Sequence, residues 1–216
     1  MTAMTAAIDP LLVLVLLLNF FLLGASQLRA VIAGSALQGA VLGLLAFAIH
    51  GAGGVEPLAV AAGVVLVKGF VLPRLLHKAM RDVAIHREVE PFIGFIPSLL
   101  LGAAATGLAV LFARTLPLVP EHRASLVLPA SFATVLCGFL ILTTRRKAIT
   151  QVVGYLVLEN GIFVLGLALF QAMPFLVEVG VLLDLFVAVF VMGIIINHIS
   201  REFASLDTAR LSNLKE

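Results

Sequence analysis

Residues 154–169 read GYLVLENGIFVLGLAL, an apolar stretch with a glutamate and an asparagine at its centre. With the residues before it, this stretch is long and apolar enough to predict a membrane-spanning helix. A carboxylate near mid-bilayer costs about 2.5–3.5 kcal/mol even on insertion-based scales. Glu159 therefore needs either a compensating group nearby or a role in which it binds and releases a proton.

The composition of the whole chain agrees with a membrane location. Of its 216 residues, 62% are hydrophobic and only 12% are charged, and the mean hydropathy is +1.17. Soluble domains contain about 25% charged residues, so the chain is expected to be an all-α integral membrane protein. The formal net charge of +2, without a basic helix face, gives no reason to expect a nucleic-acid partner. The single cysteine, Cys137, is expected to be a small packing residue.

About seven apolar segments are long enough to cross a bilayer. They run approximately over residues 8–25, 30–50, 55–76, 92–113, 126–144, 148–170 and 175–196, and a polar tail begins at residue 200. The N-terminal residues MTAMTAAIDP lack the basic region and cleavage site of a signal peptide.

The basic residues predict the orientation of these segments. With seven spans, eleven lysines and arginines fall on the side of the C-terminal tail, and two fall on the other side. The first group is Arg29, Arg74, Lys78, Arg81, Arg87, Arg145, Arg146, Lys147, Arg201, Arg210 and Lys215, and the second is Arg114 and Arg123. Because positive residues accumulate on the cytoplasmic side, we expect the N-terminus outside and the C-terminus in the cytoplasm.

Four charged residues lie inside the predicted spans: Lys68, Glu159, Glu178 and Asp184. At 1.5 Å of rise per residue, Glu159 and Asp184 lie near mid-bilayer and Lys68 slightly inward of it. The two carboxylates are too short to reach water from that depth, which favours a proton or ion pathway. Glu178, nearer the outer surface, either extends to the headgroups or joins that pathway. A static pair of Lys68 with one carboxylate remains open.

Uncharged residues complete the candidate site. Gln38 lies mid-span and is expected to hydrogen-bond across a helix interface, as is Asn19, while Asn160 adjoins Glu159. Gly39 and Gly43 have the spacing that permits close helix packing. No histidines have metal-ligand spacing, and no nucleophile adjoins a base, so neither a metal site nor a catalytic site is predicted.

A weak internal repeat is one hypothesis for how the chain is organised. Superposing the first and last three spans places Gln38 opposite Glu159 and Lys68 opposite Asp184. On this basis, residues 1–80 form a first three-helix unit, and residues 81–125 a cytoplasmic loop, the fourth helix and an outer loop. Residues 126–199 form a second three-helix unit, and residues 200–216 the cytoplasmic tail.

Several stretches closely resemble hydrogenase-4 component E, a membrane subunit of group 4 [NiFe] hydrogenases and formate hydrogenlyase-type complexes. They are GYLVLENGIFVLGLAL, LVEVGVLLDLFVAVFVMGIIINHI at residues 176–199, SLDTARLSNLKE at residues 205–216 and VVLVKGFVLPRLL at residues 64–76. The last three spans are also similar to the K subunit of respiratory complex I and the C subunit of multi-subunit Na⁺/H⁺ antiporters.

The resemblance implies a function. Glu159 matches the first of two mid-membrane carboxylates of the K subunit, and Asp184 is the nearest match to the second, with aspartate in place of glutamate. Lys68 matches the lysine of the hydrogenase-4-type family, a charge that tunes its neighbours' proton affinity. The chain would translocate H⁺ or Na⁺ in the inner (plasma) membrane beside antiporter-like membrane subunits and a peripheral hydrogenase-type module. Nickel–iron and iron–sulfur centres are expected in those partners and none in this chain.

Three alternatives remain open. The chain could serve a related antiporter or complex I-like ion pump without hydrogenase activity. It could be a scaffold whose charges form static pairs. A stand-alone transporter is the third, although no interrupted helix or substrate site is evident.

Overall fold

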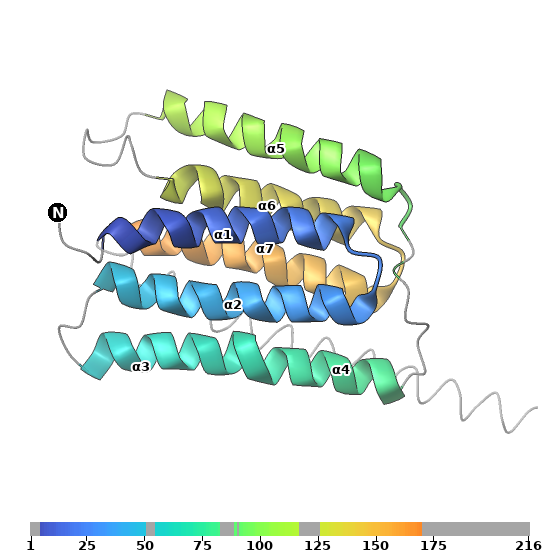
Figure 1. The fold of residues 1–216 in the computed structure, drawn as a ribbon, viewed down its shortest axis with the longest axis horizontal. Coiled ribbons are helices and arrows are strands. Elements are labelled where there is room, and N and C mark those ends of the chain that lie inside the picture. The colour runs from blue at the N-terminus through green and yellow to red at the C-terminus, as the bar shows by residue number, and fades with distance from the viewer. Residues whose placement is uncertain (1–4, 51–54, 83–88, 90, 117–125, 170–216) are drawn as a thin grey trace, which may run out of the picture.

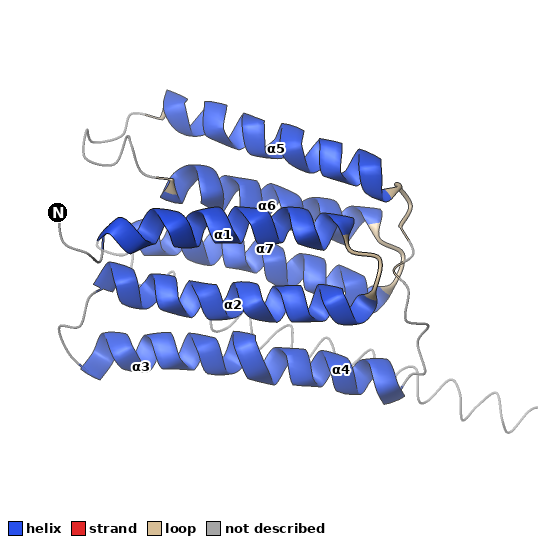
Figure 2. Cartoon of the chain, in the orientation of Figure 1, coloured by secondary structure: helices blue, strands red, loops and turns tan. Residues whose placement is uncertain are grey.

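The computed structural model describes residues 5–50, 55–82, 89, 91–116 and 126–169. All named elements in these ranges are helices (Figure 2), and an isolated bridge joins Pro91 to Arg145. In chain order the elements are α1 (Thr5–Gly24), α2 (Leu28–His50), α3 (Val55–Val64), η1 (Val65–Val71), α4 (Leu72–Asp82), α5 (Phe95–Thr115), α6 (Val127–Thr144) and α7 (Ala148–Leu169).

Helices occupy the first six predicted span positions. The largest difference is at the third, where the helical rod continues to Asp82 instead of ending at Leu76. Within the described residues, α2, α5, α6 and α7 each contain a stretch long and apolar enough to cross a membrane, and α1 contains a shorter apolar stretch, Ile8–Gly24. The chain is therefore an all-α membrane protein. The predicted seventh span and the tail lie outside the described residues.

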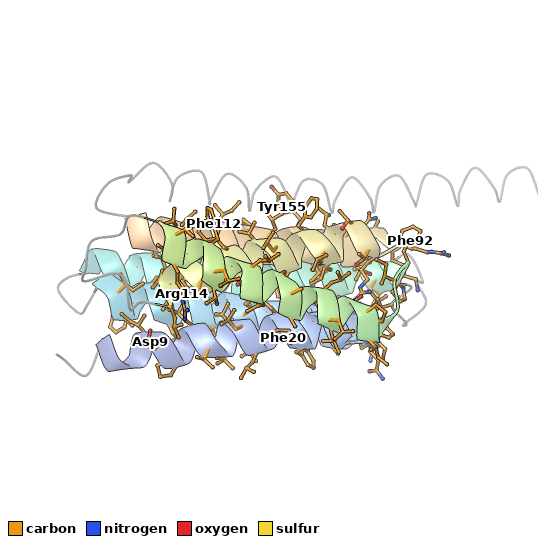
Figure 3. The ribbon with its side chains drawn as sticks, turned by 90° about the horizontal axis from the view of Figure 1, so that it is seen from above. Asp9, Phe20, Phe92, Phe112, Arg114 and Tyr155 are labelled. Atoms are coloured by element: carbon orange, nitrogen blue, oxygen red, sulfur yellow. The ribbon has the colours of Figure 1, made fainter. Side chains whose placement is uncertain are left out.

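The helices run side by side as a bundle (Figure 1). The elements α3, η1 and α4 follow one another as a rod that packs along α2, while α5 lies at the opposite edge against α1 and α6. Seen from above, Asp9 and Arg114 lie toward one end of the bundle and Phe92 at the other (Figure 3). α6 and α7 lie between the outer layers and make the most extensive helix–helix contact.

Glycines allow α6 and α7 to approach at backbone distance. A Cβ added to Gly161 would lie 2.6 Å from the backbone nitrogen of Val135 and 2.9 Å from the carbonyl oxygen of Ser131. Gly138 faces the backbone of Leu158 in the same way. Small residues let helices in a membrane approach closely enough for dispersion forces to hold them. This contact fixes the face of α7 that carries Glu159.

The element η1 is a π-helical segment with Lys68 at its centre. Two residues after it, Pro73 has no backbone N–H to donate, and its ring would clash with the carbonyl four residues earlier. The wider π turn shifts the bonding register, so that the N–H of Leu72 donates to the carbonyl of Val67, five residues back. Such segments occur frequently at functional sites. The segment packs against α2 at Gly39, where an added Cβ would lie 2.5 Å from Lys68 Cβ.

Candidate functional site

A buried ion pair joins η1 to α7. Lys68 Nζ lies 2.5 Å from Glu159 Oε1, and the two residues are 6% and 1% exposed. Breaking such a buried pair by removing one partner leaves an uncompensated charge, at a cost of about 3–5 kcal/mol. The pair therefore supplies the compensating group that Glu159 needs halfway along an apolar helix.

An unbroken chain of side-chain hydrogen bonds extends from this pair across the bundle. Lys68 Nζ donates to Asn160 Oδ1 at 3.1 Å, and Asn160 Nδ2 donates to Gln38 Oε1 at 3.0 Å. Gln38 Nε2 then donates to Asn19 Oδ1 at 2.8 Å, and Asn19 Nδ2 donates to Thr134 Oγ1 at 2.8 Å. All five residues are buried. These hydrogen bonds connect η1, α7, α2, α1 and α6, so the charged pair is linked to residues of five elements.

The chemistry of its two ends gives the chain one direction. An ammonium group can only donate, so Asn160 presents its oxygen to Lys68 and is left with its NH₂ group for Gln38. At the far end, the hydroxyl of Thr134 donates to the carbonyl of Ala130 at 2.7 Å, so its oxygen is the acceptor for Asn19. Every amide between them consequently turns its oxygen toward Lys68. This row of oriented amides thereby stabilises the positive charge on Lys68.

The apolar surroundings of the pair strengthen these interactions. Phe163, one helical turn after Glu159, places its ring 5.6 Å from Lys68 Nζ, within the range of a cation–π contact. Val41, Leu42 and Val164 belong to the buried apolar cluster nearby. Exclusion of water lowers the local dielectric constant, which increases both the attraction within the pair and the cost of an unpaired charge.

The structure brings together most of the predicted site. Lys68, Glu159, Asn160 and Gln38 are in contact, and Lys68, whose partner the sequence left open, pairs with Glu159. The predicted inter-helix role of Gln38 is confirmed by its bonds to α1 and α7. Glu178 and Asp184 lie outside the described residues, so their participation stays a prediction.

Thr134 belongs to the site but was not predicted. A threonine inside a helix commonly bonds a carbonyl of its own helix, and Thr134 does so. The residues around Thr134 therefore do not predict that its oxygen also accepts a hydrogen bond from another helix.

A second buried cation, Arg145, lies at the end of α6. Its place in a basic turn predicts a loop charge, but Arg145 is only 1% exposed. Its Nη2 donates to the Leu23 carbonyl at 2.6 Å, and its Nη1 lies 3.4 Å from both Ile93 O and Ser98 Oγ. Burial lowers the pKa of Arg145, yet a guanidinium remains charged at physiological pH.

The partners of Arg145 explain its burial. Leu23 lies in the last turn of α1, where carbonyls lack helical partners and a positive charge is favoured. Arg145 thus joins the end of α1 to the segment before α5 and to the α6–α7 turn. It is a structural cross-link at one end of the bundle, separate from the pair on Lys68.

Among the described residues, no group of three or more histidine, cysteine, aspartate or glutamate side chains could hold a metal ion. What the site offers is one carboxylate that can exchange a proton, one cation beside it, and neutral amides that hold the cation. Such arrangements of ionisable groups inside a membrane protein are typical of ion and proton pathways.

The fold and site thus define a class: a helical membrane protein with a buried lysine–glutamate pair. The chain is similar to two kinds of known protein. It is 33% identical over 195 residues to the uncharacterized protein Rv0085 of Mycobacterium tuberculosis, covering 88% of this chain and 87% of that protein. The chain belongs to the same family as Rv0085.

Hydrogenase-4 component E of Escherichia coli K12 is a more distant relative, 28% identical over 156 residues that cover 72% of each chain. The same protein of Shigella flexneri matches equally. This distant homology relates the chain to the complex I-like membrane subunits. No family model matches the chain, and no solved structure matches it.

Proposed function

We propose that the chain is a membrane subunit of an energy-converting, complex I-related assembly of the hydrogenase type, and that Glu159 carries protons within it. The observation that carries the proposal is the buried contact between Lys68 and Glu159, in a chain distantly related to hydrogenase-4 component E. Redox chemistry would take place on nickel–iron and iron–sulfur centres of the peripheral partner subunits. The assembly would lie in the inner (plasma) membrane, with antiporter-like subunits beside this one.

The chemistry follows from the two charges. In the resting pair, Glu159 is anionic and Lys68 cationic. When a proton reaches Glu159, the attraction to Lys68 weakens, while Asn160 Oδ1 still holds the ammonium group. The loss of that attraction changes the electrostatic interaction of the pair with a neighbouring charged group. A proton crossing the membrane changes energy by about 2.3 kcal/mol per 100 mV, and a shift in the strength of a buried pair is of comparable size.

Further parts of the proposal extend beyond the described residues. Asp184 would be the second carboxylate of the route, with Glu178 between it and the outer surface. The chain would cross the membrane seven times, with the N-terminus outside. The transported ion is H⁺ or, in an antiporter-like variant of the mechanism, Na⁺.

The test is proton pumping by membrane vesicles that hold the intact complex with Glu159→Gln, with redox turnover followed in parallel. We expect assembly of the complex but a loss of pumping, because glutamine cannot take up the proton. Thr150→Val is a matched control: Thr150 is also buried on α7, its hydroxyl has no hydrogen-bond partner among the described residues, and it lies outside the polar chain.

A scaffold with a static pair is the second candidate, favoured by the burial of both charges against each other. It predicts pumping at the wild-type stoichiometry in Glu159→Gln membranes. That result would refute the relay.

A further inference from the structure

Two adjoining hollows lie on the side of the bundle formed by α2, α3, η1 and α4. The first is a groove of about 860 Å³ with almost wholly apolar walls, among them Phe47, Leu58, Val65 and Leu66. The second, of about 800 Å³, is basic, and its walls include Arg29, Arg74, His77, Lys78 and Arg81. Phe70 and Arg74 line both hollows, so the groove leads into the basic hollow.

The charges in the basic hollow are concentrated on one helix face. Arg74, Lys78 and Arg81 are spaced four and three residues apart, which places them on the same side of α4. Arg29 faces them from the first turn of α2. Like charges at this spacing destabilise a helix. Among the side chains that the structure describes, no carboxylate lies within salt-bridge distance of these four cations.

Arg74 marks the junction between the apolar and basic parts. Its guanidinium lies over the ring of Phe70, 5.3 Å from the ring centroid, with its charge at the boundary between the two hollows. From Leu58 to Arg74 the rod advances about 24 Å, at 1.5 Å per residue. One leaflet of the hydrocarbon core is about 15 Å deep, so the groove is long enough to take an acyl chain over the full depth of a leaflet.

We propose that these hollows bind one anionic phospholipid, with an acyl chain along the apolar groove and the phosphate among Arg29, Arg74, Lys78 and Arg81. The two hollows match the two parts of a lipid. The apolar groove matches an acyl chain, and the basic hollow into which it leads matches an anionic headgroup. The phosphate would remove the repulsion among the α4 cations. Basic hollows between membrane helices are established binding sites for anionic headgroups in other proteins.

The test is native mass spectrometry of the full chain, purified in detergent and titrated with phosphatidylglycerol or with phosphatidylcholine of the same acyl chains. We expect one tightly retained phosphatidylglycerol and at least tenfold weaker retention of phosphatidylcholine. Each basic residue near a membrane surface is worth about 1 kcal/mol, or about fivefold in affinity. Arg74→Gln should therefore weaken retention of phosphatidylglycerol about fivefold, and Arg74→Gln with Lys78→Gln about 25-fold.

Arg146→Gln is the matched control, because Arg146 also stacks on a phenylalanine, Phe92, at the same end of the bundle but does not line either hollow. It should change retention less than twofold. Ala62→Leu narrows the groove without altering a charge and should also weaken retention. Glycerol 3-phosphate, which has the headgroup chemistry without the chains, should not displace the lipid.

Three results would overturn the proposal. The first is equal loss in Arg74→Gln and Arg146→Gln, which would indicate general surface charge. The second is unchanged retention in both Arg74→Gln and Ala62→Leu. The third is cross-linking of a photoreactive group at Leu66 to a protein subunit, and not to lipid, in the intact complex.

Discussion

Lys68 and Glu159 can be replaced singly and then together. The comparison should separate the interaction free energy of the pair from the destabilisation that each unpaired buried charge causes. The variants are Lys68→Met, Glu159→Gln and the double variant, chosen because each is close in shape to the original side chain. At a separation of 2.5 Å between Lys68 Nζ and Glu159 Oε1, the attraction is about 7 kcal/mol at an effective dielectric constant near 20. Desolvation of both ions offsets much of this gain.

Each single variant leaves a buried charge without its partner. We expect either to lower the free energy of unfolding by about 3–5 kcal/mol. Lys68→Met should be the more costly, because it also removes the donor to Asn160 Oδ1, whereas Glu159→Gln keeps an amide oxygen for the ammonium group. The double variant contains no unpaired charge and should lie within about 2 kcal/mol of the wild type, because neutral replacements of buried pairs are often tolerated.

The assay is reversible unfolding of the full chain in mixed micelles by added denaturing detergent, followed by circular dichroism. Thr150→Val provides the control, with a change within about 0.5 kcal/mol expected. A double variant whose loss equals the sum of the single losses would refute the pair as an interacting unit. A folded double variant also gives a sharp functional comparison, since under the proposed relay it should assemble without pumping.

Two other positions give predictions with matched controls. Gly39→Ala places a Cβ 2.5 Å from Lys68 Cβ and should destabilise the chain by forcing η1 away from α2. Gly63 has open space around it, so Gly63→Ala should stabilise the chain by about 0.5–1 kcal/mol in the same unfolding assay. Stabilisation by both changes would contradict the close approach at Gly39. Arg145→Met removes the charged donor to the Leu23 carbonyl and should cost about 1.5–3 kcal/mol, while Arg146→Met, on an exposed side chain, should cost less than about 1 kcal/mol. Equal losses at the two arginines would argue against the cross-link.

Much of the helix arrangement could be predicted because its signals are local. Runs of about 20 apolar residues, separated by polar or Gly/Pro-containing turns, predicted the helix positions to within a few residues at most ends. The cost of an uncompensated mid-membrane charge also led directly to Glu159 and Lys68. Hydropathy predicts too short a third span, because the last turns of α4, through Lys78 and Asp82, are polar and amphipathic.

The features that escaped prediction depend on contacts between helices. Helices that are apolar nearly all round give no sequence signal for the face they turn inward. The sequence therefore left open which carboxylate Lys68 meets. Arg145 is followed by Arg146 and Lys147 in a basic turn. The local sequence does not show that Arg145 is the residue whose side chain bonds the end of α1. The π segment likewise reflects both Pro73 and the close fit against Gly39, which only the assembled bundle brings together.

The direction of the amide chain bears on which member of the pair would exchange the proton. Lys68 donates both to Glu159 and to Asn160, and the amides beyond Asn160 turn their oxygens toward it. A proton added to Glu159 leaves a cation that Asn160 still holds. A proton taken from Lys68 would instead leave a buried carboxylate anion beside an amine, with the amide oxygens pointing at a group that no longer carries charge. The first change retains the favourable orientation of every amide, and the second loses its electrostatic benefit. Under the proposed function, Asn19, Gln38 and Asn160 therefore act as positioning residues that hold the ammonium group of Lys68, while Glu159 takes up and releases the proton.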